Sequence, residues 1–560
     1  MITTKTTTAS LPIRDRYVFL FNIDGAMIEE LEKHLQAGQL PKIKELFFEK
    51  GARFKNAFTV YPTLSAPAHQ SFLSGLQPGH HGVPSLDYLS RPLERYVDFL
   101  HPRDLLANNH LLFNFLQVYE DKISSDKAQF IFGALKPYPS LSILEGFNSG
   151  VTQTTSRPSL AHPAFHGYFA KRFPAVDFYA MDHLFKVIQE SPLEDLPRFS
   201  MVDFYSLDLT SHYLGARGEE SLKLYHHYDQ FFSHLETLLK ERGIWEKTNL
   251  VLLADHGQHL VAKRTFDLEK LFQDIGFKAN SKKMLKGNIL WGNHATGYSN
   301  LYFKMGENWK KAPSYEEIRN FPIKGKGRLN LVEVFSKNPN ISLVLAKGKG
   351  FSVELHSKEG ESRILRKRKN GEFYYRYQLI KGKDPLAYDQ VPKIKSWMDQ
   401  AKYLDQETWL QETADLDYPD SVVAIASIFD DGRAGDLILN SAPHQQFKKP
   451  FVYGHGSLVR SDRIVPLFFY GPDIKPGIYP HARLIDVAPT ILAIFGRSSL
   501  GPIDGTLRKE ILKPQTLKEW QEIGFDKNRS SPGLSRKAFA KDLEVIEKEK
   551  SKDQESREKA

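Results

Sequence analysis

The sequence predicts an α/β fold with a mostly parallel central sheet and helices on both of its faces. Three apolar runs, at residues 17–23, 198–207 and 249–254, are each followed directly by an aspartate. Continuous apolar runs of this length are typical of strands that are buried on both faces of a parallel sheet. The helical stretch 219–242 leads from the second run into the third, in the strand–helix–strand order of a βαβ unit.

Length and composition describe a large globular chain. Its 560 residues predict a core of ordinary size with an insertion or a second domain. The chain has no cysteine, so disulfides are excluded and a metal would need His, Asp, Glu or hydroxyl ligands. The net charge of +9 would favour anionic partners, but much of the excess lies in the run 363–369. We interpret that run as a solvated face or hairpin.

The N-terminal segment 1–16 is polar and predicts a flexible extension. It lacks the apolar core of an export signal, and the run 17–23 is too short to span a membrane. No other stretch reaches transmembrane length. The sequence therefore suggests either a cytoplasmic protein or one whose export signal is missing from this chain.

Two helical stretches and a loop follow the first strand. The amphipathic segment after residue 28 and the segment opened by Pro41 predict helices, with Gly51 as a C-cap. A helix is also predicted over 67–73, with Pro67 in its first turn. Ser65 would then lie at or just before a helix N-terminus, where free N–H groups favour an anion. A plain N-cap is the alternative role for its hydroxyl.

The remaining elements follow from apolar runs and turn signals. The Asn370-Gly371 pair predicts a hairpin within a charged, mostly β segment. Further strands are predicted at 129–134, 421–429, 436–440 and 464–470, helices at 110–120 and 483–495, and a loop over 136–175.

We expect four parts. They are the flexible N-terminus 1–16, a core formed by 17–309 and 416–513, a β-rich insertion or cap at 310–415, and a charged helical or disordered tail at 514–560.

Side chains that bind metals follow three of the predicted strands. They are Asp24, Asp208 with His212, and Asp255 with His256, and a glycine-flanked loop adds His455. Because parallel strands end at one edge of a sheet, these side chains can converge there. Three aspartates and three histidines suit two zinc-type ions, and a pair of ions about 4 Å apart can clamp an in-line displacement at phosphorus.

These motifs resemble those of the alkaline phosphatase superfamily, in particular its type I phosphodiesterase/nucleotide pyrophosphatase branch. The resemblance rests on NIDG at 22–25, PTLSAPAHQSFLSGLQPGHHGV at 62–83, DLTSH at 208–212, ADHGQ at 254–258, and GHGS at 454–457 with RIVPLFFYGPDIKPG after it. The motifs span about 17–500 in the order of the family. The resemblance implies an alkaline phosphatase-like fold and hydrolysis of small-molecule phosphoesters, with no nucleic-acid partner.

The resemblance also implies the roles of single residues. One divalent ion, zinc by analogy, would be held by Asp24, Ser65, Asp255 and His256, and a second by Asp208, His212 and His455. Ser65 takes the place of the nucleophile and would form a phospho-serine intermediate. Thr63 is a competing hydroxyl, but it lies two residues too early. The resemblance favours a periplasmic or extracellular location, and the sequence leaves the oligomeric state open.

Several alternatives stay open within the superfamily. The usual Asn after the H-G-[IV] motif is absent, because residues 84–87 read PSLD, and Asn108 and Asn109 are candidate replacements. A phosphomonoesterase therefore competes with the diesterase. A sulfatase would need Arg where His69 stands, and a headgroup transferase usually carries membrane helices. A binding protein without chemistry is the alternative from another class. We assign His69, His80 and His81 to structural or supporting roles, not to metal ligation.

Overall fold

The computed structural model describes residues 13–99, 130–146, 150–154, 173–261, 265–279, 285–292, 294–447, 450–498, 501 and 503–524. The predicted helix at 110–120, Asn108, Asn109 and most of the C-terminal tail lie outside these residues. Among the described helices, none combines the length and the apolar character required to cross a membrane.

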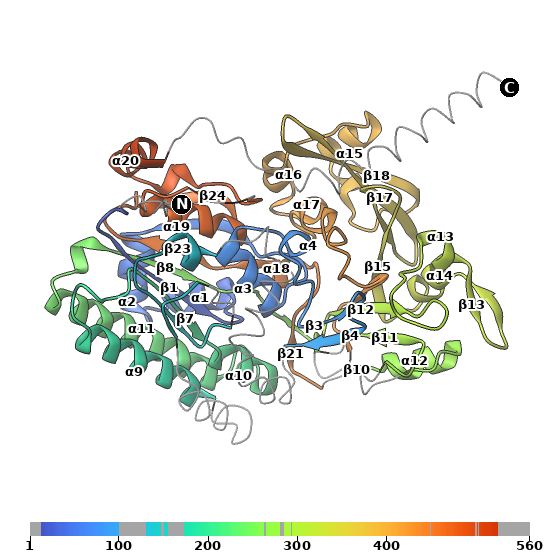
Figure 1. The fold of residues 1–560 in the computed structure, drawn as a ribbon, viewed down its shortest axis with the longest axis horizontal. Helices are drawn as coiled ribbons and strands as arrows, with labels where there is room; N and C mark the ends of the chain where they lie inside the picture. Colours follow the sequence, from blue (N-terminus) through green and yellow to red (C-terminus); the bar gives the residue numbers. More distant parts are fainter. Residues whose placement is uncertain are drawn as a thin grey trace, which may run out of the picture.

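A nine-stranded, mostly parallel sheet forms the centre of the larger lobe (Figure 1). Its strands are β1 (Tyr17–Ile23), β2 (Ala52–Phe58), β5 (Ser140–Ile143), β6 (Gln153–Thr154), β7 (Phe199–Phe204), β8 (Thr248–Leu253), β22 (Ile464–Val465), β23 (Leu467–Tyr470) and β24 (Gly477–Arg483). The order along the sheet is β22-β2-β23-β8-β1-β7-β5-β6, and β24 pairs with β2. Strand β1 is parallel to both β7 and β8. The predicted α/β class is therefore confirmed.

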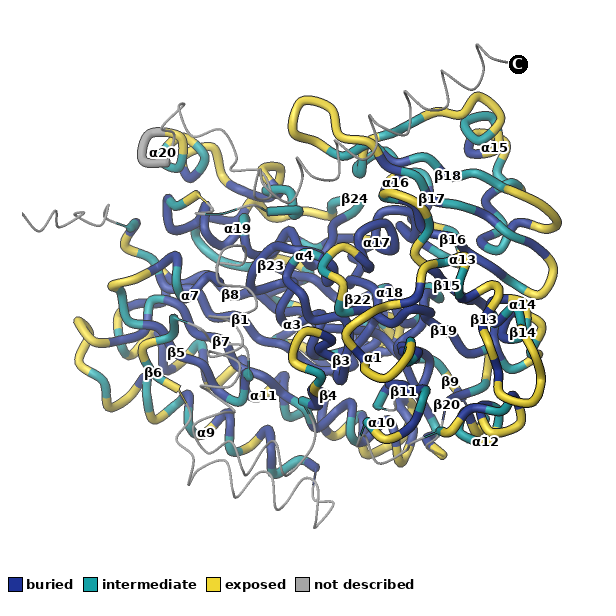
Figure 2. The backbone as a smooth tube through the Cα atoms, turned by 45° about the vertical axis from the view of Figure 1, so that its right-hand side comes forward, coloured by how far each residue is buried: buried dark blue, intermediate teal, exposed yellow. Residues whose placement is uncertain are grey.

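Helices cover both faces of this sheet. Figure 1 shows α9 (Pro174–Glu190) and α11 (Glu219–Glu241) on one side of it, and α19 (Val487–Ile494) on the other. Every residue of β1, β7 and β8 is buried, as the dark core in Figure 2 shows. The ring of Phe21 packs 5.2 Å from that of Phe232 on α11. The apolar runs thus supply the contacts that hold helices on both faces.

A seven-stranded antiparallel sheet forms the second lobe. Its strands, in spatial order, are β11 (Ile289–Trp291), β12 (Tyr298–Phe303), β19 (Leu437–Ser441), β15 (Ile341–Lys347), β16 (Val353–His356), β17 (Gly360–Lys369) and β18 (Glu372–Gly382). Strands β11 and β12 precede residue 310, and β19 follows residue 415. The segment 310–415 also contains the helices α13 (Tyr315–Arg319), α14 (Leu331–Ser336), α15 (Pro392–Asp399) and α16 (Gln406–Thr413).

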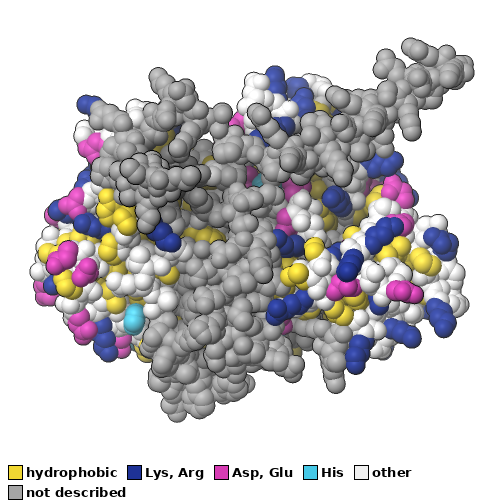
Figure 3. All heavy atoms as spheres, in the orientation of Figure 1, with side chains coloured by type: hydrophobic (Ala, Val, Ile, Leu, Met, Phe, Trp, Pro, Cys, Tyr) yellow, Lys and Arg dark blue, Asp and Glu magenta, His cyan; other side chains and the backbone are white. Residues whose placement is uncertain are grey.

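The basic run 363–369 lies on β17, which forms the predicted hairpin with β18. Asn370 and Gly371 both have positive φ, of 53° and 89°, as a two-residue hairpin turn requires. Residues along β17 alternate between buried and partly exposed up to Arg366. Lys and Arg side chains are scattered over this lobe on the face shown in Figure 3.

Four local predictions are wrong. Residues 131–134 and 421–426 are the short helices α7 (Ile131–Ala134) and α17 (Ser421–Ala426), not strands. Short apolar runs do not distinguish a buried helix from a buried strand, which explains both errors. The predicted loop 136–175 contains β5 and β6. Gly51 is not a left-handed C-cap; a Cβ there would lie 2.6 Å from the Phe469 carbonyl oxygen, so glycine permits close backbone approach.

A partly buried ion-pair network joins the two lobes at His80 on α4 (Pro78–His81). Its Nδ1 lies 2.7 Å from Asp504 and its Nε2 lies 3.1 Å from Asp430. Asp430 also pairs with Arg366 of β17. Burial alone would lower the pKa of His80, but the two carboxylates raise it to about 10.

This pKa predicts how stability depends on pH. The folded pKa lies above the ordinary value of 6.5, so the protonated imidazole stabilises the folded state fully below pH 6.5. The contribution is lost as the pH rises toward about 10. We expect the difference in unfolding free energy between the wild type and His80→Gln, measured by urea denaturation, to shrink steadily between about pH 6 and 9.5. His234→Gln, at an exposed position on α11, is the control. A difference that does not change with pH would contradict the assignment.

Candidate metal centre

The three predicted aspartates meet at one edge of the central sheet. Asp24 follows β1, Asp255 follows β8, and Asp208 lies in the first turn of α10 (Ser206–Leu214), just after β7. Because β1 lies between β7 and β8 and is parallel to both, the three chain segments leave the sheet on the same side. The convergence therefore follows from strand order and direction.

Asp24, Asp255 and His256 form the first group of possible ligands. One ligand atom from each lies within 4.8 Å of the others, and all three residues are buried. His256 Nε2 is 3.4 Å from Asp24 Oδ1 and 3.4 Å from Asp255 Oδ2. The Ser65 Oγ atom lies 3.3 Å from the same nitrogen. The four residues expected to hold the first ion are thus neighbours.

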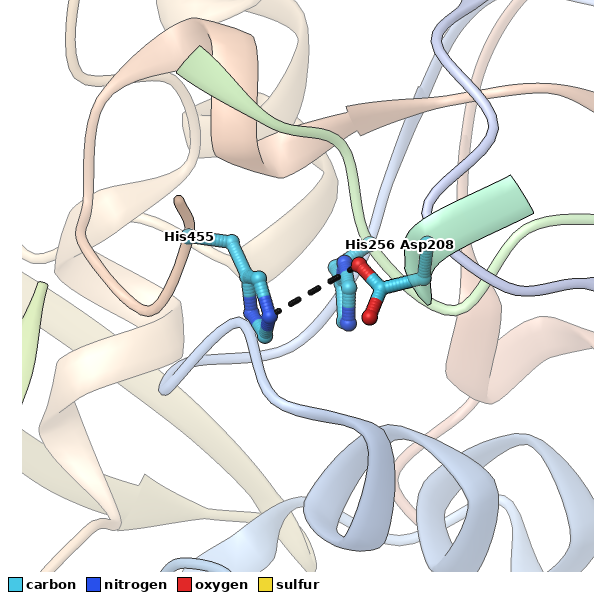
Figure 4. Close-up of side chains that lie close together, drawn as sticks. All are labelled: Asp208, His256 and His455. Atoms are coloured by element: carbon cyan, nitrogen blue, oxygen red, sulfur yellow. Dashed lines mark ion pairs between the residues drawn. The ribbon is translucent and has the colours of Figure 1, made fainter. Parts of the chain in front are cut away.

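Asp208, His256 and His455 form the second group, shown in Figure 4. His455 Nε2 lies 3.9 Å from Asp208 Oδ1, and His212 Nε2 lies 3.1 Å from Asp208 Oδ2. The rings of His256 and His455 stack with centroids 3.7 Å apart and an interplanar angle of 14°. His256 therefore adjoins both groups, whereas the family resemblance implies a place only in the first.

Backbone carbonyls orient the three histidines. The Nδ1 atoms of His212, His455 and His256 lie 2.8 Å from Tyr453 O, 2.9 Å from Thr63 O and 3.2 Å from Gly257 O, respectively. An imidazole that donates through Nδ1 keeps its Nε2 lone pair for another partner. In each case that nitrogen faces an aspartate of the cluster.

The electrostatics of the cluster favour cations. Burial raises the pKa of Asp24 well above its ordinary value, and the charges of Asp255 and Asp208 raise it further. Burial also acts to raise the pKa of Asp208, but His212 outweighs it and holds that pKa below its ordinary value. For His455, burial and then the charge of His256 lower the pKa to about 3. His455 is therefore neutral at physiological pH, as a metal ligand must be.

The donor atoms fit divalent ions of the zinc type. Asp24 Oδ1 and Asp255 Oδ2 are buried and accept no hydrogen bond from any residue that the structure describes. A buried carboxylate oxygen without a partner is costly, and a cation supplies that partner. The mixture of imidazole nitrogens and carboxylate oxygens matches zinc sites in proteins.

Ser65 is the first residue of α3 (Ser65–Ser74), not its N-cap. The N-cap position belongs to Leu64, and no side chain caps this helix end. The hydroxyl of Ser65 therefore makes no capping hydrogen bond to this helix. The competing hydroxyl of Thr63 donates to Ser457 O at 3.0 Å and accepts from Gly456 N at 2.8 Å. Thr63 is fully buried and serves the loop that carries His455.

Two sets of contacts that support the aspartates were not predicted from the sequence, although a supporting role for His69 was. Gln258 Nε2 donates to Asp208 Oδ1 at 2.5 Å, and its place directly after the Asp-His-Gly motif was an available signal. His69 lies against Asp255 and contacts two further buried acids, Glu145 and Asp203. Nothing in the sequence marks Glu145, because it lies in a stretch rich in Pro, Ser and Gly.

The position of the missing asparagine is occupied by groups that serve the fold. Leu86 is buried, and so is Asp87, which begins β3 (Asp87–Ser90). Asp87 accepts hydrogen bonds from Tyr96 OH at 2.8 Å and from Ser85 Oγ at 3.5 Å. Asp87 is therefore engaged within the fold and does not replace an amide donor to a phosphate oxygen.

Metal binding can be tested through Asp24. Burial and the neighbouring aspartates raise the pKa of its carboxyl well above the ordinary value, so its ionised form is unfavourable when no cation is bound, and the carboxylate becomes a ligand when cations are present. We expect Asp24→Asn to raise the melting temperature of metal-free protein and to reduce the further rise that zinc produces. Differential scanning fluorimetry with chelator and with zinc measures both effects.

Asp15→Asn, at a half-exposed carboxylate that pairs with Arg198 and Lys247, is the control and should leave the zinc-induced rise unchanged. If Asp24→Asn left the zinc-induced rise intact, Asp24 would not be a ligand.

Comparisons with known proteins agree with this geometry. The model of the family described as Type I phosphodiesterase / nucleotide pyrophosphatase matches residues 18–342, more than half of the chain. Human ectonucleotide pyrophosphatase/phosphodiesterase family member 1 is 24% identical over 261 residues, which are 46% of this chain and 25% of that protein. The chain thus matches about a quarter of the length of that relative.

Solved structures give the same fold. Murine ectonucleotide pyrophosphatase/phosphodiesterase 5 superposes with a TM-score of 0.52 and 12% identity, covering 89% of this chain and 100% of the murine chain. An inactive variant of the murine protein in complex with AMP gives a TM-score of 0.51, with the same identity and coverage.

Proposed function

The chain belongs to the type I phosphodiesterase/nucleotide pyrophosphatase family, and from this premise we propose that it hydrolyses phosphoester bonds in small molecules at the metal centre, with Ser65 as nucleophile. The observation that carries the proposal is the position of Ser65 Oγ, 3.3 Å from His256 within the first ligand group. Ser65 is partly exposed and is the first residue of α3, whereas the aspartates around it are buried.

Two divalent cations, of the zinc type, belong to this proposal. Asp24, Ser65, Asp255 and His256 would hold the first, and Asp208, His212 and His455 the second. When bound, such ions supply Lewis-acid charge that favours the alkoxide of a serine and stabilises a leaving oxygen.

The reaction at Ser65 is a displacement at phosphorus. Its Oγ forms a bond to phosphorus as the bond to the leaving alcohol or phosphate breaks, which gives a phospho-serine. Water then cleaves the Oγ-linked phosphoryl group and restores the hydroxyl. Because no side chain caps α3, its first amide N–H groups are available to a non-bridging oxygen of the substrate.

The charge of the centre favours a diester over a monoester. The three aspartates carry three negative charges and two divalent cations would carry four positive ones, so the centre with ionised Ser65 is neutral. Among the residues that the structure describes, no Lys or Arg pairs with Asp24, Asp208 or Asp255. Within that described part, a monoester dianion would find no Lys or Arg paired with the three aspartates, whereas a diester brings a single negative charge.

Other members of the superfamily are less well supported. A sulfatase would require Arg at the position of His69, which contacts Glu145, Asp203 and Asp255 instead. Phosphomonoester hydrolysis remains the second candidate, because the ligand set is the same for both esters.

Removal of the Ser65 hydroxyl tests the nucleophile. We expect Ser65→Ala to lower kcat on bis(p-nitrophenyl) phosphate by about 1000-fold or more, as loss of a nucleophile does elsewhere. The zinc content should be lowered by at most one ion per chain. Ser74→Ala, near the C-terminus of the same helix, is the control, because its Oγ donates to Gln70 O and accepts from Leu76 N and belongs to neither ligand group. Full activity of Ser65→Ala would overturn the assignment.

Paired substrates test the ester class. We expect kcat/KM for bis(p-nitrophenyl) phosphate to exceed that for p-nitrophenyl phosphate, for the charge reason given above. The reverse order would favour a phosphomonoesterase. Wild-type protein that holds less than about one zinc ion per chain and hydrolyses neither ester would contradict the proposed function altogether.

A further inference from the structure

A buried group of acids surrounds His69, which stands one helical turn after Ser65. His69 Nδ1 lies 2.8 Å from Glu145 Oε2 and 3.7 Å from Asp203 Oδ2, and its Nε2 lies 3.4 Å from Asp255 Oδ2. The imidazole is 3% exposed, and the three acids are 0–1% exposed. His69 thus lies between Glu145 and Asp203 on one side and Asp255 of the first ligand group on the other.

Each contact of His69 comes from a different element. Asp203 belongs to β7, Glu145 follows β5, and Asp255 follows β8. His69 itself lies on α3, four residues after Ser65, and residues four apart share one face of a helix. Through His69, the helix that carries the proposed nucleophile therefore contacts residues at or just after three strands, one of which is followed by the proposed ligand Asp255.

The ring of His69 is also held in orientation. Asn22 Nδ2 lies 3.1 Å from its Nε2 and donates to Asp203 Oδ1 at 3.0 Å. The ring of Phe72 lies 5.3 Å from it, and that of Tyr205 stacks against it at 6.4 Å and 26°. A ring that is packed on its faces and contacted at both nitrogens has little rotational freedom.

The two oxygens of Asp255 have different surroundings. Oδ1 accepts a hydrogen bond from Gly25 N at 3.2 Å. Oδ2 lies 3.4 Å from both His69 Nε2 and His256 Nε2. His69 thus contacts the oxygen that belongs to the first ligand group.

We propose that His69 is a positioning residue that holds the Asp255 carboxylate in its ligating orientation, with Glu145 and Asp203 anchoring the opposite side of the imidazole. The inference rests on the proposed function only in that a cation binds at the first ligand group. Hydrogen-bond partners of metal ligands fix ligand orientation, and their loss typically costs about 10- to 100-fold in metal affinity or activity.

The same acids define the competing interpretation. Ligand atoms of His69, Glu145 and Asp203 lie within 4.8 Å of one another, close enough to hold a cation themselves. The contact of 2.8 Å between His69 Nδ1 and Glu145 Oε2 favours an ion pair over a third metal site. The number of bound ions distinguishes the two.

The test measures zinc affinity by chelator competition on the full chain, without substrate. For His69→Gln we expect one of two zinc ions to bind about 10- to 100-fold more weakly, with the other unchanged. Glu145→Gln keeps a polar oxygen beside Nδ1 and removes only the charge, so it should lose less affinity than His69→Gln. On bis(p-nitrophenyl) phosphate, kcat should fall in the same order while KM changes little.

His81→Gln is the matched control. His81 is also buried, at 2% exposure, and it contacts α3 through Ser71 Oγ at 2.9 Å, away from the three aspartates. We expect its zinc affinities to equal those of the wild type, even if the melting temperature of metal-free protein falls as much as in His69→Gln.

Four outcomes would overturn the proposal. They are wild-type zinc affinities in His69→Gln, an equal loss of affinity in His81→Gln, a third ion in the wild type that Glu145→Gln removes, and wild-type protein that binds no ion. Because binding is measured without substrate, absence of ester hydrolysis in a protein that binds zinc would refute the proposed function and leave this inference standing.

Discussion

The burial of three aspartates at one edge of a parallel sheet is the constraint on which the site depends. Strands β1, β7 and β8 are buried along their whole length, and the three aspartates lie just beyond the points where these strands end. Carboxylates at that depth repel one another and require cationic or hydrogen-bonded partners. The imidazoles of His212, His256 and His455 meet part of that requirement, and the oxygens of Asp24 and Asp255 that accept no hydrogen bond from the described residues mark where cations would meet the rest.

The second lobe helps to build the site. The backbone of His455 is held by Thr296, whose Oγ1 donates to His455 O and accepts from His455 N, both at 2.9 Å. Gly297 N donates to the same carbonyl at 2.8 Å. These two residues directly precede β12, a strand of the second sheet. His455, a proposed metal ligand, is thus positioned by the second lobe. The strands of that lobe lie between Asp255 and His455 in the sequence.

The sequence was most informative where proposed ligands directly follow the ends of parallel strands. Strand-end aspartates are visible because an apolar run stops abruptly, and parallel pairing then brings Asp24, Asp208 and Asp255 together without knowledge of any contact. The sequence was least informative for short elements and distant contacts. The run around Ile131 is helical because tertiary packing decides between two conformations that the apolar pattern permits equally. Glu145 could not be found, since its role depends on β5 lying beside β7. His69 was visible as a residue, but its importance appears only when the acids from three separate elements surround it.

Helix α3 carries both the proposed nucleophile and the proposed positioning residue. It carries Ser65 at its first position and His69 one turn later, and it packs against α19 and the turn that precedes α19. A nucleophile on a packed helix keeps its position relative to the strand ends more accurately than one on a free loop. The same rigidity limits what this region can contribute to substrate choice. Leu86 and Asp87, which follow the adjoining motif, are buried and serve the fold, so they provide no amide for a phosphate oxygen. Chemistry at phosphorus and selection of the rest of the substrate are therefore separated in this chain. On the proposed assignment, the strand ends and α3 would determine the first, and groups outside this centre would determine the second.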